Sequence, residues 1–162
     1  MRFLAFLLVS VGLFAQEFAQ GWMGEFEHAS KQIHQLLEAT PEAKLAWRPA
    51  PGIRSTAEVH AHIISGNYFL LRAAGIASPG NSKDMPKSFS SKAEIAKLLK
   101  DSEDAVRAAY PKADMKKAVK FLGKDTTVEG VFLRLLVHSH EHMGQLIAYA
   151  RSSGVVPPWS AK

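Results

Sequence analysis

Apolar residues recur every three or four positions in four segments of the chain, which is the spacing of one buried face of an α-helix. These segments cover about 21–39, 55–74, 91–110 and 126–152. Ser55, with Glu58 three residues later, forms a capping-box pattern, Ser90 or Ser91 can cap the third segment, and Gly154 follows the fourth as a stop signal. Loops rich in Pro and Gly connect the segments. We therefore expect an all-α four-helix bundle with long connections.

The connector between the third and fourth segments, residues 111–125, has little periodicity. Its stretch AVKFLG can adopt an extended conformation, but no convincing pair of strands and no internal repeat stands out. The sequence therefore predicts no β-sheet.

The first fifteen residues are not counted as part of the fold. MRFLAFLLVSVGLFA has one Arg, then an almost unbroken apolar run, and ends in Ala15 before polar Gln16. This layout is typical of a secretory signal peptide and is short for a membrane span. We expect cleavage after Ala15, or after Ala19, with an uncleaved N-terminal anchor as the alternative. Residues 16–162 then form one exported domain, periplasmic or secreted, without a membrane span.

Composition narrows the candidate chemistry. The chain has no cysteine, which removes disulfides, thiolate ligands and cysteine nucleophiles. The formal net charge of +5 is scattered along the sequence, apart from a local cluster at 112–120. A nucleic-acid surface concentrates Lys and Arg among aromatic residues, so we expect no nucleic-acid partner.

Two histidines occupy the middle of the predicted inward face of the last helix. His138 and His142 lie on the stripe that runs from Val128 to Tyr149, and their spacing of four places the side chains about 5–6 Å apart at Cβ. Two neutral imidazoles at this spacing can bind one metal ion. The alternative is a pair of core histidines that hydrogen-bond to nearby polar groups. His140 points about 200° away, so we expect it to be exposed.

A third ligand is expected from the second helix. There His62 shares a stripe with Val59, Gly66 and Phe69, and Gly66 leaves space one turn after it. We expect His60, on the other side of this helix, to be solvated. His28 and His34 lie off the apolar stripe of the first helix and are weak ligand candidates.

Other metal motifs do not fit the sequence. Ser139 follows His138, which excludes the HExxH pattern of zincins. HSHEH matches the inverted HxxEH pattern, but those peptidases are large and need a further ligand well downstream. A di-iron bundle needs two ExxH motifs, and only Glu25 with His28 matches. The remaining prediction is one mononuclear site of three histidines.

The chain resembles the DinB/YfiT-like metalloenzyme family over essentially all of residues 16–162. The resemblance is carried by RPAPGIRSTAEVHAHIISGNYFLL (48–71) and HSHEHMGQLIAYARSSGVVPP (138–158). It implies an up-down-down-up bundle and His62, His138 and His142 as ligands of a divalent metal, which is zinc, nickel or iron among relatives. It also implies a possible homodimer. Relatives with known activity are mostly transferases or isomerases that use low-molecular-weight thiols, such as a mycothiol-dependent maleylpyruvate isomerase.

Two functions follow from these patterns. The first is an extracytoplasmic metal-dependent hydrolase or transferase acting on an unknown small molecule, with its catalytic residues unassigned. The low-molecular-weight thiols of the relatives are cytosolic, which sets an exported protein apart from them. Candidates for residues around the ligands are Glu58, Tyr68, Glu141 and Gln145, of which Glu58 is favoured as a helix cap and Glu141 as solvated. The alternative is a non-catalytic metal-binding or dimerisation module.

Overall fold

Four long helices and one small hairpin make up the computed structural model, which describes residues 20–80, 89 and 91–160. The helices are α1 (Gly21–Ala39), α2 (Thr56–Ala73), α3 (Lys92–Ala109) and α4 (Val128–Ser152), and the strands are β1 (Ala118–Phe121) and β2 (Lys124–Thr127). Short 3₁₀ turns occupy Glu42–Lys44, Tyr110–Lys112 and Pro158–Ser160. The expected signal peptide, residues 1–15, lies outside the described residues. No helix within the described ranges is long and apolar enough to cross a membrane.

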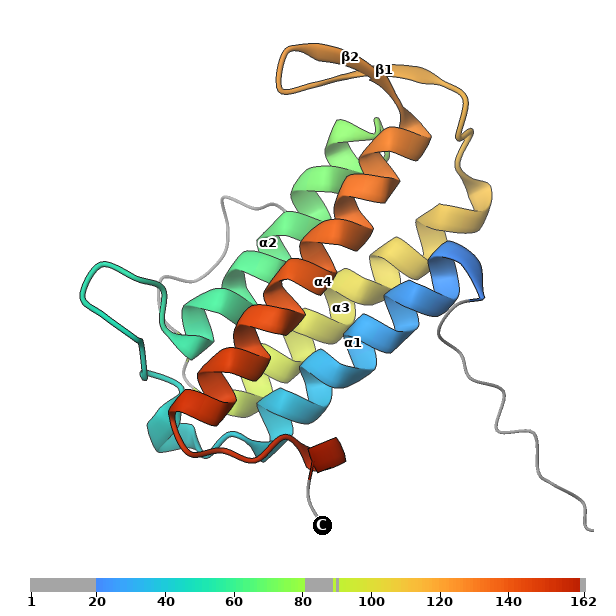
Figure 1. The fold of residues 1–162 in the computed structure, drawn as a ribbon. Helices are drawn as coiled ribbons and strands as arrows, with labels where there is room; N and C mark the ends of the chain where they lie inside the picture. Colours follow the sequence, from blue (N-terminus) through green and yellow to red (C-terminus); the bar gives the residue numbers. More distant parts are fainter. Residues whose placement is uncertain (1–19, 81–88, 90, 161–162) are drawn as a thin grey trace, which may run out of the picture.

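The helices form the predicted four-helix bundle with the up-down-down-up order. In Figure 1, α1 and α4 run in one direction, whereas α2 and α3 run in the other. Helix α2 packs against both α3 and α4, and α1 packs against α4. The all-α prediction is confirmed.

Side-chain caps define where three of the helices begin. The Ser55 hydroxyl accepts from the Glu58 backbone N–H, and the Glu58 carboxylate accepts from the Ser55 N–H at 2.6 Å, which completes the predicted capping box. Ser91 rather than Ser90 caps α3. Thr127 caps α4, so this helix begins at Val128, two residues later than the pattern predicted.

The hairpin corrects the expectation that no strands pair. β1 and β2 are antiparallel, with Ala118 opposite Thr127 and Phe121 opposite Lys124. Leu122 and Gly123 form the turn with φ of 50° and 80°. Two positive φ values are typical of a type I′ turn, which usually carries Asn-Gly. Leu122, which is 77% exposed, stands where Asn is usual, so the sequence lacks the common signal of this turn.

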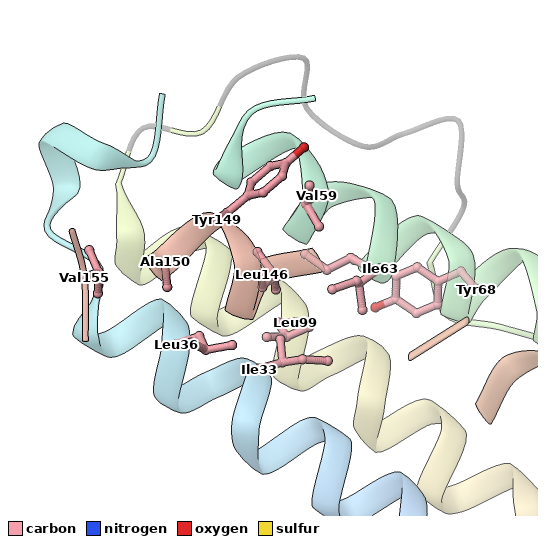
Figure 2. Packing of buried hydrophobic residues seen from close by; sticks show 11 residues of the cluster. Ile33, Leu36, Val59, Ile63, Tyr68, Leu99, Leu146, Tyr149, Ala150 and Val155 are labelled. Atoms are coloured by element: carbon pink, nitrogen blue, oxygen red, sulfur yellow. The ribbon is translucent and has the colours of Figure 1, made fainter. Parts of the chain in front are cut away.

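Two apolar clusters fill the bundle, one toward each end. The cluster at the hairpin end includes Phe26, Leu71, Val131 and Leu135. The other includes Ile33, Val59, Ile63, Leu99 and Leu146, and Figure 2 shows these side chains meeting between the helices. On α4, the segment between Leu135 and Leu146 carries the predicted histidine ligands. The fold therefore places these histidines between two well-packed apolar regions.

Candidate metal site

Three histidine side chains from two helices converge at one point. His62 on α2 meets His138 and His142 on α4, and one ring nitrogen of each lies within 4.8 Å of the other two. The Nε2 atoms of His62 and His138 are 3.2 Å apart. The ring centroids are 4.9, 4.6 and 4.5 Å apart, and the rings meet edge to face. The structure thus brings together the three residues that the sequence predicted as ligands.

Local sequence explains why the rings can meet. His138 and His142 project side by side because they are four residues apart on α4. Gly66 on α2 leaves room for the His138 ring, since a Cβ at this position would lie 2.3 Å from the His138 Cε1 atom. The prediction that Gly66 leaves space at the site is confirmed. Gly144 plays no such part, because a Cβ there would meet nothing within 4 Å.

The site is partly withdrawn from water. His138 is buried, whereas His62 and His142 are half-buried. Burial lowers the pKa of His62 to about 4, with further contributions from Arg54 and His142. Burial likewise lowers the pKa of His138 to about 4, together with the neighbouring His142 and His62. Both rings are therefore neutral at pH 7, and a neutral imidazole has the lone pair that a metal ion needs.

The nitrogen positions suit a metal ion. Two nitrogens bound to one tetrahedral zinc ion lie roughly 3.3 Å apart, because each bond is about 2.0–2.1 Å long. The His62–His138 pair is already at this separation, 3.2 Å. The Nδ1 atom of His142 lies 2.8 Å from the Gln145 Oε1 atom, which leaves the other ring nitrogen of His142 available as a ligand. The residues present therefore fit a three-histidine ion site, although they do not select a metal.

A family model for the DinB superfamily matches residues 25–146 of the chain. The chain belongs to the DinB superfamily. The matched range includes all three converging histidines. No match was found among curated proteins.

Solved structures of DinB-like proteins share this DinB fold. One, from Bacillus cereus ATCC 10987, is 22% identical, covers 88% of this chain and 97% of its own, and has a TM-score of 0.76. Another, from Bacillus subtilis, is 16% identical, covers 83% of this chain and 92% of its own, and has a TM-score of 0.63. At these identities the likeness establishes the fold alone.

The four residues predicted to surround the ligands separate into different roles in this DinB-superfamily chain. Gln145 contacts His142 directly. Glu58 serves in the α2 cap and also pairs with Arg48 at 3.2 Å. Glu141 is exposed and pairs with Arg134 at 2.6 Å, as expected for a solvated residue. Tyr68 lies in the same apolar cluster as Ile63 and Leu146, and its pKa is raised by burial and by Asp101 on α3.

Two of the other histidines differ from their predicted environments. His60 is fully buried rather than solvated, and its Nδ1 atom donates to the Thr56 carbonyl at 2.8 Å. The error arose because α2 is covered by both α3 and α4, so more than one stripe of this helix is buried. His140 is half-buried rather than exposed, and its Nε2 atom lies 3.2 Å from the Glu25 carbonyl oxygen on α1. Neither ring joins the three-histidine group.

The two histidines of α1 also lie outside the site. His28 bonds to Gln32 at 3.0 Å, and its ring lies 6.4 Å from that of His140. His34 bonds to Glu103 on α3 at 3.0 Å. Both were weak ligand candidates, and neither belongs to the group of converging nitrogens in the described part of the chain.

Sequence reasoning missed two polar features inside the bundle. Tyr149, interpreted as a packing residue, is buried but also accepts a hydrogen bond from Gln145 Nε2 at 2.9 Å. Glu103 on α3 is 2% exposed, and it pairs with His34 and, at 3.5 Å, with Arg107. Glu103 and Arg107 line a pocket of about 530 Å³ between α1 and α3. Glu103 is a charged residue next to the buried Ser102, so apolar periodicity did not predict that its side chain is buried.

Proposed function

We propose that His62, His138 and His142 bind one divalent transition metal ion and that the protein is a metal-dependent hydrolase or transferase. The observation that carries this proposal is the convergence of three ring nitrogens within 4.8 Å, two of them on rings whose pKa is lowered to about 4. Neutral rings bind a metal without first losing a proton at pH 7. Zinc, nickel and iron are the candidate ions.

The number of ligands favours catalysis over a structural role. Structural zinc sites are usually closed by four protein ligands, whereas catalytic zinc sites have three and keep one position open. The group found among the described residues has three members. A divalent ion held by them supplies Lewis acidity for an ester, an amide or a similar electrophile, or for binding a substrate thiol.

The chain's own residues set up the rest of the site. The Gln145 Oε1 atom lies 2.8 Å from the His142 Nδ1 atom, and Gly66 lets the His138 ring lie close to α2. Arg54 precedes the α2 cap, is exposed, and contributes to the low pKa of His62. Within the described part of the chain, no carboxylate joins the three converging histidines, so the reaction type is unassigned.

The second candidate is a non-catalytic metal-binding or dimerisation module. It is favoured by one observation, that the ligands come from α2 and α4, so that an ion would link two helices. The two candidate functions differ in whether the fourth coordination position of the metal ion is open or closed. A small anion such as azide perturbs the spectrum of a cobalt-substituted site when that position is open, and leaves it unchanged when the site is closed.

We further propose that the protein is exported, with residues 1–15 as its signal peptide. The support is the sequence alone, namely the apolar run that follows Arg2 and ends at Ala15, before polar Gln16. Export removes the protein from the cytosolic thiols. Hydrolysis, or transfer that uses another acceptor, is therefore the chemistry to test first.

The deciding experiment is elemental analysis of the mature protein purified without a His tag. We expect about one equivalent of a transition metal per chain, lost in His142→Ala and retained in His140→Ala. His140 is the matched control because it lies on the same helix but bonds to α1. Metal in the wild type justifies a screen of esters, amides and thiol acceptors. No metal, with no uptake of added zinc, nickel or iron, overturns the proposal.

A further inference from the structure

A chain of two hydrogen bonds runs along α4 from the histidine site into the core. His142 Nδ1 lies 2.8 Å from Gln145 Oε1, and Gln145 Nε2 lies 2.9 Å from the Tyr149 hydroxyl. The three residues are spaced by three and four positions, so they lie one above another on the same helix face. This series of hydrogen bonds begins at His142, a candidate ligand, and ends at Tyr149, whose side chain is buried.

Tyr149, at the end of this series of hydrogen bonds, is packed among other side chains. Tyr149 is 7% exposed and belongs to the apolar cluster that all four helices form. Its ring meets the Trp47 ring edge to face at a centroid distance of 5.2 Å. Figure 2 shows Tyr149 at the margin of this cluster. The hydroxyl is therefore a fixed point for a hydrogen-bond partner.

The direction of the two bonds determines which nitrogen of His142 can bind an ion. When Gln145 Nε2 donates to Tyr149, the amide oxygen faces His142 and accepts its Nδ1–H. The lone pair then resides on Nε2. With the amide reversed, Gln145 would donate to Nδ1, the ring proton would move to Nε2, and this nitrogen could not be a ligand.

We propose that Gln145 and Tyr149 are positioning residues that hold His142 as the tautomer with its proton on Nδ1 and its Nε2 free for the ion. This inference rests on the proposed metal site and deepens it. Partners that bind the second nitrogen of a ligand imidazole fix its tautomer and orientation, and their loss typically weakens metal binding by about 10–100-fold. Gln145 acts on His142 directly, and Tyr149 acts through Gln145.

Four variants and one control test the proposal. Gln145→Leu removes both hydrogen bonds, and Tyr149→Phe removes only the second. Gln145→Glu keeps an acceptor for His142 and accepts from the Tyr149 hydroxyl. The fourth variant combines Gln145→Leu with Tyr149→Phe. The control is Gln32→Leu, because Gln32 bonds to His28, four residues earlier on α1, away from the site.

The first readout needs no metal. Long-range proton–nitrogen NMR spectra of the histidine rings in the metal-free protein report which nitrogen of His142 carries the proton. We expect the Nδ1–H tautomer in the wild type, in Gln145→Glu and in Gln32→Leu, and a mixture of tautomers in Gln145→Leu. The same tautomer ratio in Gln145→Leu as in the wild type overturns the proposal.

The second readout is the zinc dissociation constant from competition with a chromophoric chelator. We expect Gln145→Leu to weaken zinc binding by about 10–100-fold and Tyr149→Phe by less than about tenfold. Gln145→Glu should bind zinc at least as tightly as the wild type. Tyr149→Phe should have no further effect on a Gln145→Leu protein, because its influence passes through the amide. If the two substitutions weaken zinc binding by factors that multiply in the combined variant, Tyr149 acts independently of Gln145. This result would overturn the proposal that Tyr149 acts through the amide.

The two readouts separate this inference from the proposed function. A wild type that shows the Nδ1–H tautomer, lost in Gln145→Leu, but binds neither zinc, nickel nor iron supports the positioning roles and rejects the metal site. A wild type that binds zinc with a His142 tautomer insensitive to Gln145 supports the metal site and rejects the positioning roles.

Discussion

The His138 ring on α4 lies directly against the backbone of Gly66 on α2. A Cβ built on Gly66 would be 2.3 Å from His138 Cε1 and 2.9 Å from Nδ1. His138 is also the most deeply buried of the three converging histidines. The His138 ring can therefore occupy this position only because Gly66 has no side chain.

We predict that Gly66→Ala disrupts the site, although alanine favours helices. Replacing a helical glycine by alanine otherwise stabilises by roughly 0.5–1 kcal/mol. Here the methyl group must displace the His138 ring, and overpacking of this kind costs roughly 1–3 kcal/mol. We expect a lower free energy of unfolding in urea and at least about a tenfold loss of zinc affinity.

Gly144→Ala is the matched control, because Gly144 lies on α4 between His142 and Gln145 and its Cβ would meet nothing within 4 Å. It should keep zinc affinity and raise stability slightly. Unchanged zinc affinity in Gly66→Ala would contradict the packing account of the site.

A second prediction separates the two histidines of α2. His62→Ala should abolish metal uptake with little loss of stability, because His62 is half-buried at the site. His60→Ala should retain metal but lose roughly 1–3 kcal/mol, since the fully buried ring bonds to the Thr56 carbonyl. Metal content and urea unfolding of the two variants give the comparison. Loss of metal in His60→Ala at full stability would contradict this assignment.

Helix spacing was enough to predict the bundle and the three converging histidines. Apolar periodicity gave the helices to within two residues at their ends, and the spacing of four residues gave the His138–His142 pair. The up-down-down-up order of the helices was implied by the resemblance to the DinB/YfiT-like family, not by the apolar periodicity. The hairpin was missed because Leu122 occupies a positive-φ position where Asn would have signalled a turn.

Burial on α2 was harder to predict because this helix has two packed neighbours. A single inward stripe through His62 placed Phe69 in the core, yet Phe69 is 42% exposed. The same stripe left His60 to solvent, yet His60 is fully buried. The stripe through His62 therefore runs from the core at Val59 to the margin of the buried surface at Phe69. Periodicity gives the angle between side chains but not the width of the buried arc.

A third prediction concerns export, which depends on residues 1–15. The full chain expressed in a Gram-negative bacterium should be found outside the cytoplasm with an intact mass that begins at Gln16, or at Gln20 if cleavage follows Ala19. Leu7→Arg, placed in the middle of the apolar run, should keep the full-length chain in the cytoplasm. Cytoplasmic wild-type protein of full length would reject both the signal peptide and the proposed location.

The fourth prediction concerns the buried carboxylate of Glu103. It is 2% exposed and pairs with His34 and Arg107, while Arg107 also holds Glu27 through two bonds of 2.7 and 2.8 Å. Removing one partner of a buried pair leaves a charge without compensation and costs roughly 3–5 kcal/mol in fully buried cases. Arg107 is partly exposed, which reduces the effect.

We therefore expect Arg107→Ala to lower the free energy of unfolding by roughly 2 kcal/mol. The same substitution in a Glu103→Leu background should cost less, because no buried charge is then left unpaired. Lys120→Ala, which breaks the exposed Lys120–Asp125 pair of the hairpin, is the control and should change stability by less than about 0.5 kcal/mol. Urea unfolding of the four proteins of the cycle and of the control measures the coupling. An equal cost of Arg107→Ala in both backgrounds would mean that Arg107 stabilises the bundle through its other partners, Glu27 and Asp104, and not through Glu103.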